Sequence, residues 1–220
     1  MSITHEDIAL VLSDALQNEQ LDEALATLKG LRPVDIADAL ELVEPELTWG
    51  LLTRLPDRAE VYAYFGPDEQ VRLAQEFPAE VLAQLVSEMP SDERTDLFKR
   101  LAPEQQGRLL PALAKVERED IRKLASYQEG TAGALMTSDY AMLRADMNVG
   151  QALHALRLEA PDAETIYHSY VVGEERKLLG VVSLRDLILA DPSTKISDLM
   201  TEGVISGVVS EDQADIARSI

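Results

Sequence analysis

Two aspartates four residues apart, Asp92 and Asp96, are the side chains in this sequence best suited to holding a cation. They lie near the start of a predicted helix, where this spacing puts both carboxylates on one side, with Cβ atoms about 5–6 Å apart. Two like charges there repel by about 0.8 kcal/mol in bulk water and by about 3 kcal/mol at an effective dielectric constant near 20. A divalent cation removes that penalty, and Mg²⁺ prefers a few carboxylates together with retained water.

Helix capping is the alternative reading of the same residues. Ser91, Asp92 and Glu93 are residue types that favour a helix N-terminus whether or not a metal binds. Asp35 and Asp38 form a similar pair three residues apart, and we interpret them as acids of a helix start. The residues alone leave capping and metal binding both open.

Catalytic signatures are missing from the sequence. It contains no HExxH, no GxSxG, no P-loop and no GxGxxG motif. The three histidines, His5, His154 and His168, do not cluster along the chain. We therefore expect a protein that is not an enzyme.

The balance of charge is strongly acidic, with 40 acidic and 20 basic side chains and a formal net charge of −20. Nucleic-acid binding and adhesion to an anionic membrane both need an excess of Lys and Arg, so the charge argues against both. An acidic surface concentrates cations, although it also serves plain solubility. With 46% hydrophobic residues over 220, the chain can bury a core, as one large or two small domains.

Neither covalent cross-links nor membrane insertion are predicted for this chain. It has no cysteine, hence no disulfide framework. The N-terminus, MSITHEDIAL, lacks the basic and apolar regions of a signal peptide. No apolar run approaches the roughly 18 residues that span a bilayer.

Prolines recur at an almost constant interval in the first half of the chain. They stand at positions 33, 45, 56, 67, 78, 90 and 103, with apolar-periodic blocks between them. Proline is tolerated in the first helical turn and breaks a helix interior, so each interval predicts one short helix that starts near its proline. Helices this short are unstable alone. We expect them to stack into an α-solenoid or superhelical bundle from about residue 4 to 127.

A different pattern begins after Tyr127 and predicts an α+β unit. The expected order is a helical turn, a strand, a helix, two strands separated by GEERK, and a helix, at Thr131–Met136, Tyr140–Leu143, Val149–Leu158, His168–Val172, Leu178–Ser183 and Leu184–Leu189. A second such unit begins in 203–220 and stops within a predicted helix. We therefore expect the chain to be truncated.

Three segments together resemble the junction between the helical N domain and the first CBS domain of MgtE-type magnesium transporters. They are EGTAGALMTSDYAMLR (129–144), PDAETIYHSYVV (161–172) and LLGVVSLRDLILADPSTKISDLM (178–200). The resemblance implies a mainly α fold, an N-terminal α-solenoid followed by an α+β CBS domain. Its expected domains are a helical N domain at 1–128, a first CBS motif at 129–200 and the start of a second CBS motif at 201–220.

The resemblance also implies Mg²⁺ ligands. Asp92 and Asp96 match an acidic pair that helps to bind Mg²⁺ between the N domain and the CBS region, with backbone near Ala134 contributing. Asp212 and Asp215 lie where the family carries further cation-binding acids.

One departure from the family pattern weakens the second group of acids. Ala214 stands at what looks like one of those acidic positions. Asp212 also suits a helix N-cap.

Adenine nucleotides such as ATP are the second ligand that the resemblance implies. In the family they lie between paired CBS motifs, against positions that correspond to His168, Ser183, Arg185 and Asp186. His168 departs from the family's tyrosine, although a neutral imidazole can still stack. Capping is again the alternative, because Ser183 and Asp186 fit the start of a helix.

The resemblance therefore implies the cytosolic Mg²⁺-sensing region of a magnesium transporter or channel, on the cytoplasmic face of the cell membrane. High Mg²⁺ would bridge acidic faces of the N domain and the CBS region and close the pore. The expected partners are Mg²⁺, a second copy through the CBS domains, and a transmembrane domain that this chain lacks, with no nucleic acid. Two other functions stay open: an adenine-nucleotide sensor, and a passive scaffold for a protein partner.

Overall fold

The computed structural model describes residues 4–18, 20–159 and 165–219. These form two compact units, which we name the helical unit and the α/β unit. The helical unit comprises the chain up to Met89 together with Glu93–Ala125, and the α/β unit comprises Pro90–Asp92 and the chain from Ser126 onward. Positions 161–164, the first four of the segment PDAETIYHSYVV (161–172), lie outside the described residues.

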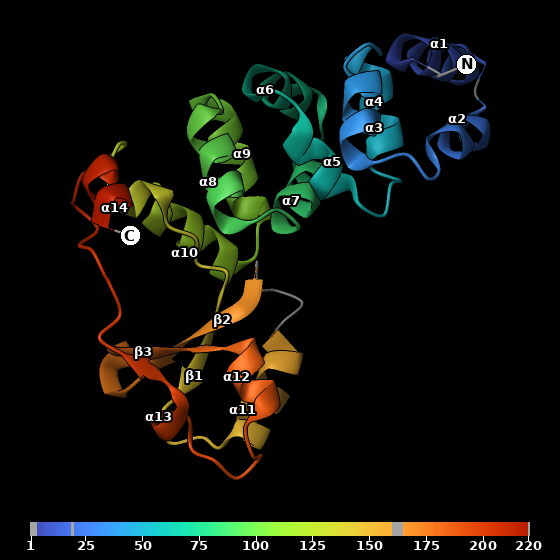
Figure 1. The fold of residues 1–220 in the computed structure, drawn as a ribbon. Coiled ribbons are helices and arrows are strands. Elements are labelled where there is room, and N and C mark those ends of the chain that lie inside the picture. Colours follow the sequence, from blue (N-terminus) through green and yellow to red (C-terminus); the bar gives the residue numbers. More distant parts are fainter. Residues whose placement is uncertain (1–3, 19, 160–164, 220) are drawn as a thin grey trace. The chain divides into compact units, whose positions relative to one another are not determined.

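Short helices follow one another through the first half of the chain (Figure 1). They are α1 (His5–Gln17), α2 (Leu21–Leu28), α3 (Pro33–Leu40), α4 (Pro45–Leu52), α5 (Arg58–Tyr64), α6 (Pro67–Glu76), α7 (Ala79–Ser87), α8 (Ser91–Arg100), α9 (Pro103–Ala112) and α10 (Lys115–Leu124). The proline interval predicted their starts, because four of them begin with proline itself and Pro78 is the N-cap of α7. A proline in the first turn costs nothing, since its missing N–H would have no partner inside the helix.

Most of the packing between helices of the helical unit joins helices that are two places apart in the chain, although α1 also packs closely on α2. The contacts α1·α3, α3·α5, α5·α7 and α7·α9 form one row, and α2·α4 and α4·α6 form another. Because helices of two to three turns are marginal alone, this stacking supplies their stability. The prediction of a solenoid-like stack of short helices is confirmed.

The core of the helical unit contains an aromatic group that the stacked helices enclose. Tyr62 is completely buried, and its ring lies 6.3 Å from Phe77, which meets Trp49 edge-on at 6.5 Å. The Tyr62 hydroxyl donates to the Gln70 carbonyl at 2.5 Å, and the Gln70 amide donates to the Tyr62 carbonyl at 3.0 Å. A buried hydroxyl without a partner would destabilise the fold, and these two hydrogen bonds remove that penalty for Tyr62.

The α/β unit is built on a four-stranded sheet of order β1-β2-β3-β4. β1 and β2 are parallel, whereas β2–β3 and β3–β4 are antiparallel. The elements are η1 (Ala132–Leu135), β1 (Tyr140–Arg144), α11 (Val149–Glu159), β2 (Thr165–Val172), η2 (Glu174–Arg176), β3 (Leu178–Ser183), α12 (Leu184–Leu189), α13 (Ile196–Leu199), β4 (Thr201–Glu202) and α14 (Gln213–Ser219). The expected turn, strand, helix, strand, strand, helix order is confirmed.

The two faces of this sheet differ in burial. Ala141, Leu143, Val171 and Val182 point into a small core that α11 and α12 also line. On the other face Met142, Tyr170 and Val181 lie in register across β1, β2 and β3, and Tyr170 is 39% exposed. This alternation is the period of two expected for strands with one face packed and one face open. Among the described residues, no helix combines the length and apolarity needed to cross a bilayer.

Candidate functional site

Asp92 and Asp96 both lie on α8, but their surroundings differ. Asp92 is half-buried, and its Oδ1 atom is fully buried without a hydrogen-bond partner. Asp96 is 62% exposed, with the Lys99 ammonium 3.9 Å from its Oδ1. The two acids that the sequence pairs by spacing are therefore not equivalent. The Oδ1 atom of Asp92 is buried without a hydrogen-bond partner, whereas the carboxylate of Asp96 already lies near the Lys99 ammonium.

The first turn of α8 is fixed by residues that follow Met136. Ser91 is completely buried, and its backbone N–H donates to Asp139 Oδ2 at 2.6 Å. The Ser138 N–H donates to Ser91 Oγ at 2.8 Å, and Ser91 Oγ lies 2.9 Å from Thr137 Oγ1. Sequence reasoning treated Ser91 as a local cap and missed Thr137, Ser138 and Asp139. Nothing in the local sequence indicates partners more than forty residues away.

The unpaired oxygen of Asp92 fits a hard cation. A buried carboxylate oxygen without a donor is costly, and a metal ion is one of the few partners that satisfies it. Within the described ranges no group of three or more His, Asp or Glu side chains is arranged to hold a metal ion. Mg²⁺ does not require such a cage, because it is commonly held by one or two carboxylates and keeps several waters.

Ala134 lies in η1, which packs against the chain ahead of α14. The Gly133 N–H donates to the Val209 carbonyl at 2.9 Å, and the Ala132 N–H donates to the Glu211 carbonyl at 2.8 Å. A Cβ at Gly133 would meet the Tyr127 ring at 2.7 Å, which explains why the close approach uses glycine. The structure thus brings the turn around Ala134 next to the segment that precedes Asp212.

Asp212 and Asp215 themselves have local roles at the start of α14. Asp212 Oδ1 accepts the Ala214 N–H at 2.8 Å, as a capping aspartate does. Asp215 Oδ1 accepts from the Arg218 guanidinium at 2.9 Å, and the side chains of Asp215 and Arg218 are mostly exposed. The capping role considered for Asp212 is therefore present in the structure.

The four residues considered for nucleotide binding gather at one end of the β2–β3 pair. His168 lies directly opposite Ser183 in the antiparallel register, so both side chains share a face of the sheet. Ser183 is the N-cap of α12, where its Oγ accepts the Asp186 N–H at 3.1 Å. Arg185 is exposed and forms no ion pair with the described residues. Ser183 Oγ also donates to Asp186 Oδ2 at 2.5 Å, so its single proton is used and one acceptor position stays available for another partner.

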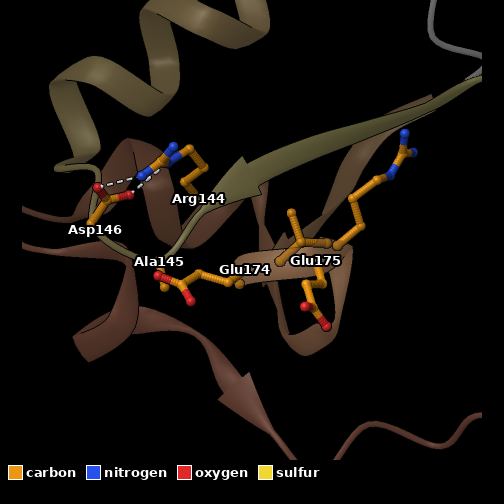
Figure 2. Close-up of a pocket in the computed structure, with 8 residues that line it drawn as sticks. Arg144, Ala145, Asp146, Glu174 and Glu175 are labelled. Carbon is orange, nitrogen blue, oxygen red and sulfur yellow. Dashed lines mark hydrogen bonds and ion pairs between the residues drawn. The ribbon is translucent and has the colours of Figure 1, made fainter.

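A separate cavity of about 560 Å³ lies at the opposite end of the sheet (Figure 2). It is lined by Arg144, Ala145, Asp146, Val172, Gly173, Glu174, Glu175 and Arg176, and so by none of the predicted nucleotide residues. Arg144 donates to both carboxylate oxygens of Asp146 at 2.9 Å, and this contact lowers the pKa of Asp146. Glu175 and Arg176 both have φ of 59°, a left-handed conformation that is uncommon outside glycine.

Two protein-family profiles match this chain. The MgtE intracellular N domain matches residues 31–130, and the CBS domain matches residues 132–193. A magnesium transporter MgtE of Thermus thermophilus is 35% identical over 97% of this chain and 48% of its own length. One of Bacillus subtilis is 27% identical over the whole of this chain and 49% of its own length. The chain thus spans about half the length of these two relatives.

Solved structures extend this likeness to the fold. The cytosolic domain of the Mg²⁺ channel MgtE, in complex with ATP, is 36% identical with a TM-score of 0.85, over 96% of this chain and 87% of that one. The soluble part of a magnesium transporter is 31% identical with a TM-score of 0.85, over 98% and 86% of the two chains. Identity at this level over most of both chains, with the same fold and domain order, shows common descent. The chain belongs to the MgtE family and corresponds to the cytosolic regulatory region of its members.

Proposed function

We propose that this chain senses Mg²⁺ for a magnesium transporter or channel at the cytoplasmic face of the cell membrane. High Mg²⁺ favours a closed arrangement in which cations bridge acidic faces of the N domain and the CBS region, and the pore of the whole protein shuts. Mg²⁺ drives this change only through its higher affinity for the closed state. The net charge of −20 supports the proposal, because it opposes the closed state without cations.

The observation that carries the proposal is the buried, unpaired Oδ1 of Asp92. Asp96, four residues along α8, supplies a second carboxylate that Lys99 currently neutralises in part. Asp212, Asp215 and the backbone near Ala134 are proposed as further contributors, as the family resemblance implies.

The proposed organisation follows the same resemblance. Residues 1–128 form the N domain, 129–200 the first CBS motif and 201–220 the start of a second. Two copies pair through their CBS domains, and a transmembrane domain of the whole protein receives the signal. None of these roles involves nucleic acid.

A Mg²⁺ titration of residues 1–220 at constant ionic strength tests the proposal. The readouts are protection from a protease, the radius of gyration from solution scattering, and the free energy of unfolding. We expect saturable compaction with Mg²⁺ and none with Na⁺. At a hundredfold excess over its Kd, a ligand that binds only the folded chain stabilises it by about 2.7 kcal/mol.

The decisive variant is Asp92→Asn combined with Asp96→Asn, which keeps shape and removes both charges. It should lose the response to Mg²⁺. Without Mg²⁺ it should be more stable than the unaltered chain, because a buried unpaired charge is gone. Asp146→Asn combined with Asp191→Asn removes the same charge at exposed positions and should respond normally. Equal responses in both double variants would contradict the site, and a response matched by Na⁺ would favour a passive acidic scaffold.

Adenine-nucleotide binding is a second candidate function, favoured by the placement of His168 opposite Ser183 beside the unpaired Arg185. A related structure was solved with ATP bound, and Asp186 is proposed to accept a ribose hydroxyl. Calorimetry with ATP tests this: Arg185→Ala should weaken binding, whereas Arg157→Ala, an exposed arginine on α11, should not. Equal affinities in the two variants would remove the nucleotide role from these residues.

A further inference from the structure

The N-terminal N–H of α8 is bound by a side chain from far along the chain. Ser91 N–H donates to Asp139 Oδ2 at 2.6 Å, across a separation of 48 residues. The first N–H groups of a helix have no partner inside it, and the helix dipole favours a negative group beside them. A carboxylate that accepts such an N–H forms a charge-assisted hydrogen bond, which is among the stronger kinds in proteins.

A second set of hydrogen bonds fixes Ser91 and Asp139 relative to each other. Ser91 Oγ accepts the Ser138 N–H at 2.8 Å and lies 2.9 Å from Thr137 Oγ1, which also accepts the Asp139 N–H at 3.2 Å. Ser91 is completely buried. The turn before β1 and the first turn of α8 therefore form one closed hydrogen-bonded group, in which the backbone at Ser91 has little freedom.

Asp92 follows directly on this fixed residue, and its Oδ1 is buried without a hydrogen-bond partner. A carboxylate oxygen held away from water without a donor is unfavourable, so the surroundings must impose its position. We infer that Asp139 is a positioning residue for the cation site at Asp92. Its carboxylate holds the first turn of α8 so that Asp92 presents an oxygen ready for a divalent cation. This inference rests on the proposed function.

Asp139 acts in this arrangement through Asp92 and does not itself bind the ion. Its Oδ2 accepts the Ser91 N–H at 2.6 Å. Groups that orient a metal ligand typically change metal affinity by 10- to 100-fold when they are removed. Because a positioning group needs only an acceptor oxygen, an amide in its place should preserve the function, whereas a carboxylate ligand changed to an amide loses the charge that attracts the cation.

The test measures the Mg²⁺ affinity of residues 1–220 by calorimetry in four variants. Asp139→Ala should weaken binding about tenfold, and Asp139→Asn should stay within about threefold of the unaltered chain, because its amide oxygen still accepts the Ser91 N–H. Asp92→Asn should weaken binding on its own. Adding Asp139→Ala to Asp92→Asn should cause no further loss, since the two residues act on one oxygen.

A readout that does not depend on Mg²⁺ checks the contact itself. Hydrogen exchange of the Ser91 amide should be faster in Asp139→Ala than in Asp139→Asn, with melting temperatures showing that both variants fold. Asp191→Ala is the matched control, because Asp191 Oδ1 also accepts a backbone N–H, from Ser193 at 2.8 Å. It should leave Mg²⁺ affinity unchanged.

The outcomes separate the inference from the function on which it rests. If Asp92→Asn binds Mg²⁺ like the unaltered chain, the cation site itself is wrong and the inference falls with it. If Asp92→Asn is weak but Asp139→Ala is normal, only the positioning role is overturned. An Asp139→Asn variant as weak as Asp139→Ala would also overturn it, because that result requires the charge of a ligand.

Discussion

The two units of this protein use their buried groups in different ways. In the helical unit, short helices stack in rows, and polar groups such as Tyr62 and Gln70 satisfy each other inside the core. In the α/β unit, a small core lies on one side of the sheet. Within the described residues, both buried side-chain oxygens that lack a partner, on Asp92 and Ser169, belong to the α/β unit.

This difference suggests where binding can arise. Buried polar groups that pair inside the protein, as Tyr62 and Gln70 do, add stability and offer nothing to a ligand. A buried carboxylate oxygen without a partner, as on Asp92, makes its unit less stable than it could be, and a ligand that satisfies the oxygen recovers that deficit. We therefore expect ligand-dependent behaviour to originate in the α/β unit and core substitutions to act most strongly in the helical unit.

The largest effect should come from Leu73→Ala, which empties a fully buried position of the helical core. We expect a loss of about 2–5 kcal/mol in the free energy of unfolding, from lost burial and a residual cavity. Trp49, the single tryptophan of the sequence, lies in this unit, so its fluorescence during urea unfolding measures the change. The counterpart Leu187→Ala in the α/β core should leave the Trp49 transition in place. A large shift there would show that the two units unfold as one.

A smaller effect is expected for Tyr62→Phe, which removes the hydrogen bond to the Gln70 carbonyl and should cost about 1 to 1.5 kcal/mol near neutral pH. Burial raises the pKa of Tyr62 above its ordinary value of 10.0. The unfolded chain therefore loses this proton first, and the stability from Tyr62 declines as the pH rises above 10.

Urea unfolding at pH 8 and at pH 10.5 measures both parts of that prediction. Tyr62→Phe should flatten the loss of stability between the two values. Tyr64→Phe, on the same helix but 52% exposed, should keep the slope of the unaltered chain. Identical slopes in all three proteins would contradict the assignment to Tyr62.

Ser183→Ala should cost the α/β unit about 1 kcal/mol through loss of the N-cap of α12. Hydrogen exchange in α12 measures the effect locally, and we expect faster exchange there and little change in the helical unit. Ser183→Thr should restore most of the protection, because threonine also caps. No change in Ser183→Ala would contradict a stabilising role of this hydroxyl as the cap of α12.

The smallest effect, and the one of opposite sign, is expected for Ser169→Ala. Ser169 is completely buried on β2 and its Oγ has no partner, so its removal should stabilise the α/β unit by about 0.5 kcal/mol. Ser87→Ala in the helical unit removes a hydroxyl that donates to the Ala83 carbonyl at 2.8 Å, and it should be neutral or destabilising. Thermal unfolding of both variants gives the comparison. Destabilisation by Ser169→Ala would show a bond to an ordered water.

Local signals predicted most of the secondary structure. Pro33, Pro45, Pro67 and Pro103 marked helix starts because a fixed φ and a missing N–H are tolerated only there. The β-rich composition of Leu178–Ser183 predicted β3 with its bounds. β4 was not predicted. It has only two residues, and it exists as a strand because Gly180 and Val181 pair with it.

The candidate site was predictable only in part. Spacing alone singled out Asp92 and Asp96, and residue type alone singled out Ser183 as a cap. The role of Asp139 could not be foreseen, because its partner Ser91 is 48 residues away and no local rule relates the two. The placement of His168 opposite Ser183 likewise depends on the register of β2 and β3. A shift of one residue would put the two side chains on opposite faces of the sheet.

By itself, the sequence determined the family, the starts of the short helices, the order of the α/β elements and the acidic charge, because each is a property of composition or of neighbours along the chain. Only the tertiary structure decided that Asp92 carries a buried, unpaired oxygen while Asp96 faces Lys99 and solvent. Burial and hydrogen bonding are set by whatever packs around a side chain, and the residue next to Asp92, Ser91, is held by Asp139 from 48 residues away.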